Sequence, residues 1–148
     1  MEATVIFPHQ LFARHPSVRH GRLVFLIEDQ RFFGEAGSGI LFHKNKLVLH
    51  RASMKAYQKS LTASGHSVHY IEHEESESMN YLFDPLMALD VKVLHLTDPV
   101  DSTLEKRLTE NAKKSGVMLH IEASPAFLTD PAWFRDFFGK PVHYSMTS

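Results

Sequence analysis

The chain has 148 residues, 43% of them hydrophobic and 11% aromatic, which is typical of one globular domain and excludes a disordered protein. It contains no cysteine, and this excludes disulfides, thiolate nucleophiles and cysteine-ligated zinc or iron–sulfur sites within the chain. Sixteen basic and 17 acidic residues give a net charge of −1, whereas tight nucleic-acid binding usually requires a strongly basic surface.

The first half of the chain begins with two short apolar runs. Residues 4–7 predict a strand that Pro8 ends, and a loop with Pro16 and Gly21 follows. Residues 23–27 are five consecutive apolar residues, a pattern that suits a central parallel strand covered on both faces. Residues 30–41 are expected to form a loop.

A long helix is expected next, over residues 44–63, and Gly65 is placed to cap its carboxyl end. Its apolar residues recur at three- and four-residue steps, as on one face of an amphipathic helix; they are Leu47, Met54, Tyr57 and Leu61. Residues 67–71 predict a third strand. The helix expected over residues 77–88 contains Pro85, which should kink or shorten it.

The second half continues the alternation of strands and helices. Residues 91–96 predict the fourth strand, and residues 117–121 predict the fifth. Between them, Ser102 and Glu105 have the spacing of a capping box, which predicts a helix that runs from Ser102 to Ser115.

An aromatic helix is expected near the carboxyl end of the chain. Asp130 and Pro131 have the form of a helix cap and a first helical position. The aromatic side chains that follow fit either a core or a surface that docks against a further domain; they are Trp133, Phe134, Phe137 and Phe138.

The alternation of strands and helices predicts an α/β fold, with one five-stranded parallel sheet and helices on both of its faces. In such sheets, ligands bind beyond the carboxyl ends of the strands. His9 and Gln10 follow the first strand, Glu28 follows the second and Asp98 follows the fourth. With the start of the helix at Lys44, they predict a polar site. The alternative is that they are ordinary strand-end loops.

Other patterns indicate no catalytic residue and no metal site. His66 and His69 are three apart in or beside a strand and should face opposite sides of it, so we expect no metal shared with His73. No serine has the G-x-S-x-G context of a hydrolase. The basic cluster that includes Lys44 and Arg51 is expected to be an exposed helical face rather than a phosphate site.

Three segments resemble the photolyase-related proteins, and the resemblance extends in the expected order over essentially the whole chain. They are residues 5–12, residues 42–55, and residues 127–129 with Trp133 and Phe134. The group is similar to the bacterial iron–sulfur cryptochromes and (6-4) photolyases. The resemblance implies a three-layer, doubly wound, Rossmann-like domain over residues 1–148 with strand order 3-2-1-4-5. It also implies an antenna chromophore, 6,7-dimethyl-8-ribityllumazine, bound in this domain.

The resemblance places the remaining cofactors elsewhere in the polypeptide. FAD, a [4Fe–4S] cluster and the DNA-binding surface are expected in a larger carboxy-terminal helical domain that this chain lacks. That domain is then the expected partner, and DNA is contacted only through it. This chain alone is expected to have no catalytic activity.

The resemblance also assigns site residues by position. His9 stands where chromophore-binding members have an aspartate, Gln10 is retained, and Glu28 matches the carboxylate after the second strand. Within the helix motif, the matching residues are Lys44, Ser53 and Met54.

The leading hypothesis is an antenna domain that holds a chromophore and transfers excitation to flavin, in DNA repair or light sensing. The alternatives are a light-independent nucleotide- or flavin-binding module and a structural docking domain with a vestigial pocket. No apolar stretch approaches the ~20 residues that span a bilayer. The amino terminus lacks the pattern of a signal peptide. We therefore expect a cytoplasmic protein without membrane contact.

Overall fold

The computed structural model describes residues 1–35, 38–39, 41–73, 78–129 and 131–139. These residues form five strands and five helices. The strands are β1 (Glu2–Ile6), β2 (Leu23–Ile27), β3 (Val68–Ile71), β4 (Val93–Thr97) and β5 (Met118–Glu122). The helices are α1 (Gln30–Phe33), α2 (Lys44–Ala63), α3 (Asn80–Ala88), α4 (Ser102–Ser115) and α5 (Pro131–Phe138).

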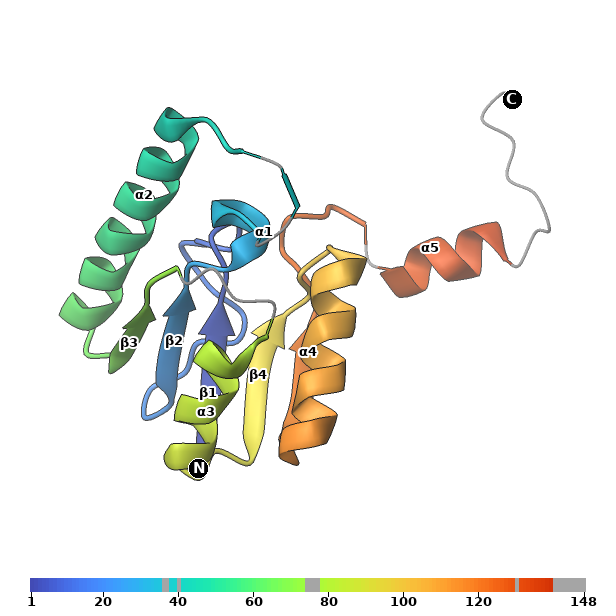
Figure 1. Ribbon diagram of the computed structural model, residues 1–148. Coiled ribbons are helices and arrows are strands. Elements are labelled where there is room, and N and C mark those ends of the chain that lie inside the picture. Colours follow the sequence, from blue (N-terminus) through green and yellow to red (C-terminus); the bar gives the residue numbers. More distant parts are fainter. Residues whose placement is uncertain (36–37, 40, 74–77, 130, 140–148) are drawn as a thin grey trace.

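The five strands form one sheet in the order β3-β2-β1-β4-β5, and every neighbouring pair is parallel (Figure 1). Helix α2 packs on one face of this sheet, and α3 and α4 pack on the other. The predicted three-layer, Rossmann-like α/β fold and its strand order are therefore confirmed.

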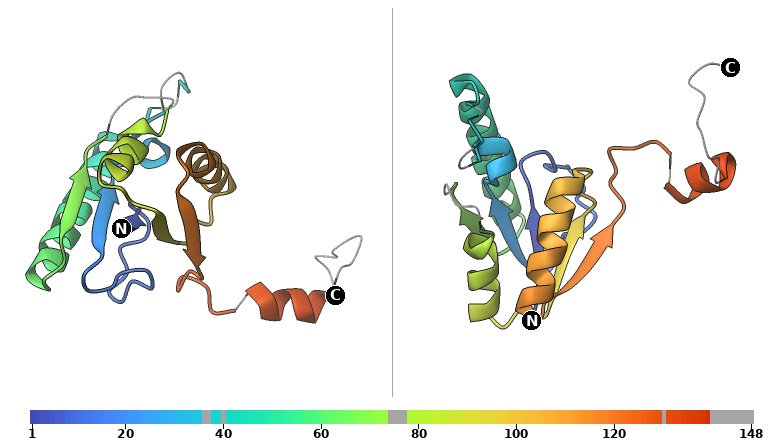
Figure 2. Two further views of the ribbon diagram at one scale, coloured as in Figure 1. Left: turned by 90° about the horizontal axis from the view of Figure 1, so that it is seen from below. Right: turned by 45° about the vertical axis from the view of Figure 1, so that its right-hand side comes forward.

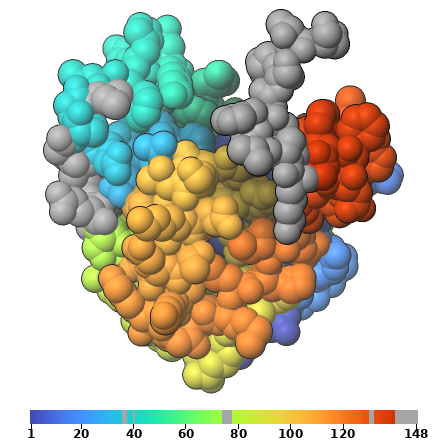
Figure 3. Space-filling view, turned by 90° about the vertical axis from the view of Figure 1, so that its right-hand side faces the viewer, coloured from blue at the N-terminus to red at the C-terminus, as the bar shows by residue number. Residues whose placement is uncertain are grey.

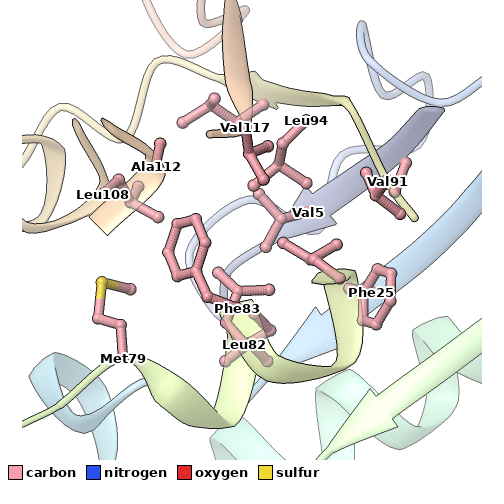
Figure 4. Close-up of a cluster of buried hydrophobic side chains, with 14 of the residues drawn as sticks. Val5, Phe25, Met79, Leu82, Phe83, Val91, Leu94, Leu108, Ala112 and Val117 are labelled. Carbon is pink, nitrogen blue, oxygen red and sulfur yellow. The ribbon is translucent and has the colours of Figure 1, made fainter. Parts of the chain in front are cut away.

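Side-chain alternation along the strands divides the core into two clusters. On β1, Ala3 and Val5 face α3 and α4, whereas Ile6 faces α2. Figure 4 shows the first cluster, in which Val5 and Phe25 from the sheet meet leucine and phenylalanine side chains of α3. All of these strand residues are fully buried, so the central strands are fixed by apolar packing on both faces.

Helix α5 stands apart from this body. It projects away from the sheet beyond β5 (Figure 2) and forms a separate lobe beside α4 and β5 in the space-filling view (Figure 3). Its Trp133 and Phe137 rings stack on each other 5.0 Å apart and are largely exposed. The aromatic helix is thus an exposed surface among the described residues and contributes nothing to the two core clusters.

Most elements lie where the sequence predicts them. Strand β2 and helix α2 match the prediction residue for residue, and the other strands start within two residues of it. Pro85 lies inside α3, which nevertheless continues to Ala88. The predicted helix start at Glu77 and the predicted cap Asp130 lie outside the described residues.

The sequence did not predict α1. Asp29 caps this four-residue helix by accepting a hydrogen bond from the backbone N of Arg31, and Gly34 ends it with a φ of 129°. That φ lies in the region that glycine adopts without steric cost. Four residues are too few to show a helical period, so the prediction of a loop here was wrong.

The predicted amino-terminal cap of α4 was also wrong by one residue. Ser102 is the first helical residue, and Asp101 is the cap, with its Oδ1 accepting a hydrogen bond from the Leu104 backbone N at 2.9 Å. The other carboxylate oxygen of Asp101 accepts hydrogen bonds from the Arg31 guanidinium at 3.0 and 3.3 Å. Asp101 therefore joins α4 to α1 as well as capping its own helix.

We expect Asp101→Ala to lower the free energy of unfolding by about 1–2 kcal/mol, because the cap and a partly exposed ion pair are both lost. Ser102→Ala is the matched control and should change it by less than about 0.5 kcal/mol. Urea unfolding at pH 7 measures both. If Ser102→Ala lowers the free energy of unfolding more than Asp101→Ala does, then Ser102 caps the helix, as the sequence suggested.

Candidate functional site

The loops that follow β1 and β4 meet at the carboxyl edge of the sheet. The Gln10 side chain donates hydrogen bonds to the carbonyl oxygens of Thr97 at 2.9 Å and Asp98 at 3.2 Å. His9 Nε2 donates to the Pro99 carbonyl oxygen at 2.8 Å. The loops after β1 and β4 are therefore joined by these hydrogen bonds, whereas the single site that the sequence predicts from these loops, Glu28 and the start of α2 stays a prediction.

Burial lowers the pKa of His9, although the hydrogen bond to Pro99 and the carboxylates of Asp101 and Asp29 oppose the shift. His9 is therefore mainly neutral at pH 7, and its Nε2 carries the proton that is donated. Its ring stacks on Phe32 of α1 at 4.7 Å. His9 therefore ties the β1 and β4 loops to α1.

Glu28, at the end of β2, is held in a network of four hydrogen bonds. Its side chain is fully buried and accepts from Arg51 Nε at 2.7 Å and Arg51 Nη2 at 2.5 Å. It also accepts from the Tyr70 hydroxyl at 2.6 Å and the His73 backbone N at 3.0 Å. Burial alone would raise the pKa of Glu28, but these donors outweigh it, and the pKa lies below its ordinary value.

Asp29 is a second buried carboxylate at this edge, and the sequence did not select it. Its side chain is fully buried and accepts hydrogen bonds from the Arg31 backbone N at 2.9 Å and the Tyr81 hydroxyl at 2.5 Å. Arg107 Nη1 of α4 lies 3.6 Å from its Oδ1. Burial and the neighbouring Asp29 carboxylate both raise the pKa of Tyr81. Asp29 thus connects α1, α3 and α4.

A small cavity opens beside the Glu28 network. It has a volume of about 190 Å³, and its lining residues are Phe33, Leu47, Val48, Arg51 and His73. The Phe33 ring stacks with His73 at 5.9 Å and contacts His50 at 6.0 Å. The Arg51 side chain is 52% exposed although its guanidinium binds Glu28. We call these five lining residues the strand-end site.

The seven site residues that the sequence selected do not form one cluster. Gln10 and Glu28 are buried and use their polar atoms on neighbouring protein groups. Met54 is fully buried in the core cluster between α2 and the sheet, and Lys44 and Ser53 are exposed on α2. His9 and Asp98 lie beside Gln10 and are not among the residues that line the strand-end site.

The cavity lining itself was missed by the sequence. Arg51 is exposed on α2, as expected, but the sequence did not indicate that its guanidinium pairs with the buried Glu28. Phe33 lies on the short helix that the sequence did not predict, and His73 follows β3 directly. The sequence did offer one signal, the carboxylate of Glu28 after a buried strand. Such a group requires a cation or several hydrogen-bond donors nearby, which could have pointed to Arg51.

Comparison with known proteins now decides the family. The sequence model of the family described as deoxyribodipyrimidine photo-lyase-related protein matches residues 4–148. The chain belongs to this family. An uncharacterized protein of Acanthamoeba polyphaga mimivirus is 31% identical over 140 residues, which cover 91% of this chain and 70% of the relative. The resemblance to photolyase-related proteins is confirmed, and the narrower likeness to iron–sulfur cryptochromes stays a prediction.

The helices of this photolyase-related chain are short or polar. Among the described residues, none of them combines the length and the apolar character that a bilayer span requires.

Proposed function

We propose that this photolyase-related chain is an antenna domain, which binds a flat conjugated chromophore at the strand-end site and passes excitation to a flavin. The observation that supports the proposal is the cavity itself. It lies at the carboxyl edge of a parallel sheet, and aromatic rings and a half-exposed guanidinium line it.

The lining suits a planar ring with carbonyl groups. Phe33 and His73 offer stacking faces, and Leu47 and Val48 cover the ring with apolar surface. Arg51 supplies donors to a ring carbonyl or ring nitrogen. In 6,7-dimethyl-8-ribityllumazine, a dione ring system would take this position.

The cavity volume limits how much of the chromophore can be enclosed. Ligand sites usually enclose roughly 300–1,000 Å³, and this cavity is about 190 Å³. We infer that only the ring system is enclosed and that the ribityl chain extends toward solvent. Because the Glu28 carboxylate is occupied by Arg51, Tyr70 and His73, the recognition of this chromophore would fall to Arg51.

The repair chemistry would belong to another part of the same protein. We propose that residues 1–148 form the amino-terminal domain and that FAD, a [4Fe–4S] cluster and the DNA surface lie in a carboxy-terminal helical domain. The net charge of −1 supports a DNA surface outside this chain. No catalytic step is assigned to the described residues.

A second candidate function is a purely structural docking domain, and two observations favour it. The polar groups of Gln10 and Glu28 are already satisfied within the protein. Helix α5 and the segment before it expose a large apolar surface around a groove of about 640 Å³, which Phe127, Leu128 and Phe134 help to line. An adjoining domain would bury that surface.

Chromophore binding separates the two candidates. We expect the purified chain to bind 6,7-dimethyl-8-ribityllumazine, as measured by the change in its fluorescence, and to bind it more tightly than FMN or FAD. Val48→Trp should fill the cavity and weaken binding at least tenfold, and Lys59→Trp, elsewhere on the exposed surface of α2, should leave it unchanged.

The alternative outcomes are distinct. Preference for FMN or FAD would indicate a nucleotide- or flavin-binding module that works without light. Failure to bind any of the three ligands, with Val48→Trp indistinguishable from the unsubstituted chain, would leave the structural docking domain.

A further inference from the structure

Two histidines face each other across the β4–β5 pair. The register of these parallel strands places His95 opposite His120 and Thr97 opposite Glu122. Because side chains alternate along a strand, His120 and Glu122 point to the same face as His95. One potential ligand atom from each of His95, His120 and Glu122 lies within 4.8 Å of the other two.

His95 is held in a specific orientation by a carboxylate on a third strand. Its Nε2 lies 3.0 Å from Glu2 Oε2 of β1. A hydrogen bond to this carboxylate places the proton on Nε2, so that Nδ1 carries a lone pair. Nδ1 is buried and has no hydrogen-bond partner among the described residues. His95 as a residue is only 9% exposed.

A buried ring nitrogen without a partner is uncommon in a folded protein and asks for an explanation. Ring nitrogens that bind metals have the same arrangement as His95, since the opposite N–H of the ring usually donates to a carboxylate. The second imidazole and the Glu122 carboxylate complete a set of three ligands. Four histidines have a buried ring nitrogen without a hydrogen-bond partner among the described residues, and His95 is the one that belongs to this cluster of potential ligands.

We propose that His95, His120 and Glu122 bind one Zn²⁺ ion and that Glu2 positions the His95 ring. Two imidazoles and one carboxylate suit zinc and its neighbours in the transition series, whereas Ca²⁺ and Mg²⁺ prefer oxygen ligands alone. Three protein ligands leave the fourth tetrahedral position to water. His120 is exposed, so the ion reaches the site from solvent.

The site closes with small side-chain movements. Zinc bonds of ~2.0–2.1 Å in a tetrahedron put ligand atoms roughly 3.4 Å apart, which is closer than the 4.8 Å limit on their separation here. Rotation of the exposed His120 side chain covers that difference. Arg19, whose Nη2 lies 4.0 Å from Glu122 Oε2, is 60% exposed and is free to move away as the metal binds.

A metal ion bound here would hold the edge strand β5 to its neighbour β4. The ligands come from β4 and β5, and Glu2 extends the contacts to β1. The same face of β5 is otherwise thinly covered, with Met118 67% exposed. Zinc would therefore stabilise the β5 edge of the sheet, independently of the strand-end site.

The test uses the chain without an affinity tag, after removal of metal by a chelator. Calorimetry with Zn²⁺ is expected to show one ion per chain. Co²⁺ is expected to give the intense visible absorption of a four-coordinate complex, which Zn²⁺ abolishes by displacement. His120→Ala should weaken zinc binding at least tenfold, and Glu2→Gln should weaken it roughly 10–100-fold.

His69→Ala is the matched control, since His69 is an exposed strand histidine outside the cluster, and it should bind zinc as the unsubstituted chain does. The thermal midpoint of metal-free His120→Ala should equal that of the metal-free chain, because this side chain is exposed. Zinc binding that His120→Ala leaves unchanged would overturn the proposal. So would the absence of saturable binding, or a weak octahedral Co²⁺ spectrum. None of these measurements uses the chromophore, so the result is independent of the proposed antenna function.

Discussion

Asp29→Ala is expected to lower the free energy of unfolding by about 3–5 kcal/mol, the range seen when one partner of a buried charged group is removed. Its carboxylate has no exposed surface and accepts hydrogen bonds from Tyr81 and the Arg31 backbone N. Without it, these donors and the nearby Arg107 guanidinium, which is 16% exposed, lose a buried acceptor. Urea unfolding at pH 7 measures the loss, and the midpoint of thermal unfolding should fall by roughly 6–15 °C.

Asp98→Ala is the matched control for this prediction. Asp98 follows strand β4 at the same edge of the sheet, but it is only half-buried, and its carboxylate accepts from the Val100 backbone N at 2.8 Å. We expect it to cost about 1 kcal/mol. Equal costs for the two variants would show that Asp29 does not connect α1, α3 and α4 in the way described.

The strands of the sheet could be located from the sequence because most of them are short apolar runs. The five consecutive apolar residues of β2 predict a strand covered on both faces, and the leucine, methionine and tyrosine spacing of α2 predicts its buried stripe. The strand order came from family resemblance, since no local pattern encodes it. The short helix α1 was missed because it has no apolar run that could indicate it. Helix α1 is one turn long, and its boundary depends on the Asp29 cap.

The site was less predictable because its residues are fixed by partners far away in the chain. Gln10 binds backbone carbonyls 87 and 88 residues later, and Glu28 binds Arg51, which the sequence shows only as part of a basic cluster on an exposed helical face. The sequence correctly placed these polar residues at strand ends. It gave no means of telling that neighbouring protein groups occupy their polar atoms.

The histidine pair of β4 and β5 shows the same limit. The two strands read Val-Leu-His-Leu-Thr and Met-Leu-His-Ile-Glu, with histidine in the middle position of each. The two histidines become neighbours only because the strands are adjacent, parallel and in this register. The sequence instead drew attention to His66, His69 and His73, which lie within one stretch of chain but contact other aromatic rings.

Arg51→Met is expected to destabilise the protein by about 2 kcal/mol at pH 7, and the cost should shrink as the pH falls. In the folded protein, Glu28 is buried, yet its pKa lies below the ordinary value of 4.5 because Arg51, Tyr70 and His73 donate to it. A carboxylate with a lowered folded-state pKa contributes stability above its unfolded pKa and loses it as the pH falls through the folded one. Loss of the Arg51 donors and charge leaves only Tyr70 and His73 to oppose burial, so the Glu28 pKa is higher in the variant. The variant therefore has a lower free energy of unfolding than the unsubstituted chain at pH 7, and this difference disappears when Glu28 is protonated.

The magnitude lies below that of a fully buried pair because the Arg51 side chain is 52% exposed and is partly screened by water. Urea unfolding between pH 7 and pH 4 measures the difference between the variant and the unsubstituted chain. Lys55→Met, one turn later on α2, removes the exposed pair with Glu72 and the contact of Lys55 Nζ with the Tyr70 ring, and it should cost less than about 1 kcal/mol. A deficit for Arg51→Met that stays constant from pH 7 to pH 4 would show that the packing of its side chain, rather than the Glu28 charge, sets the cost.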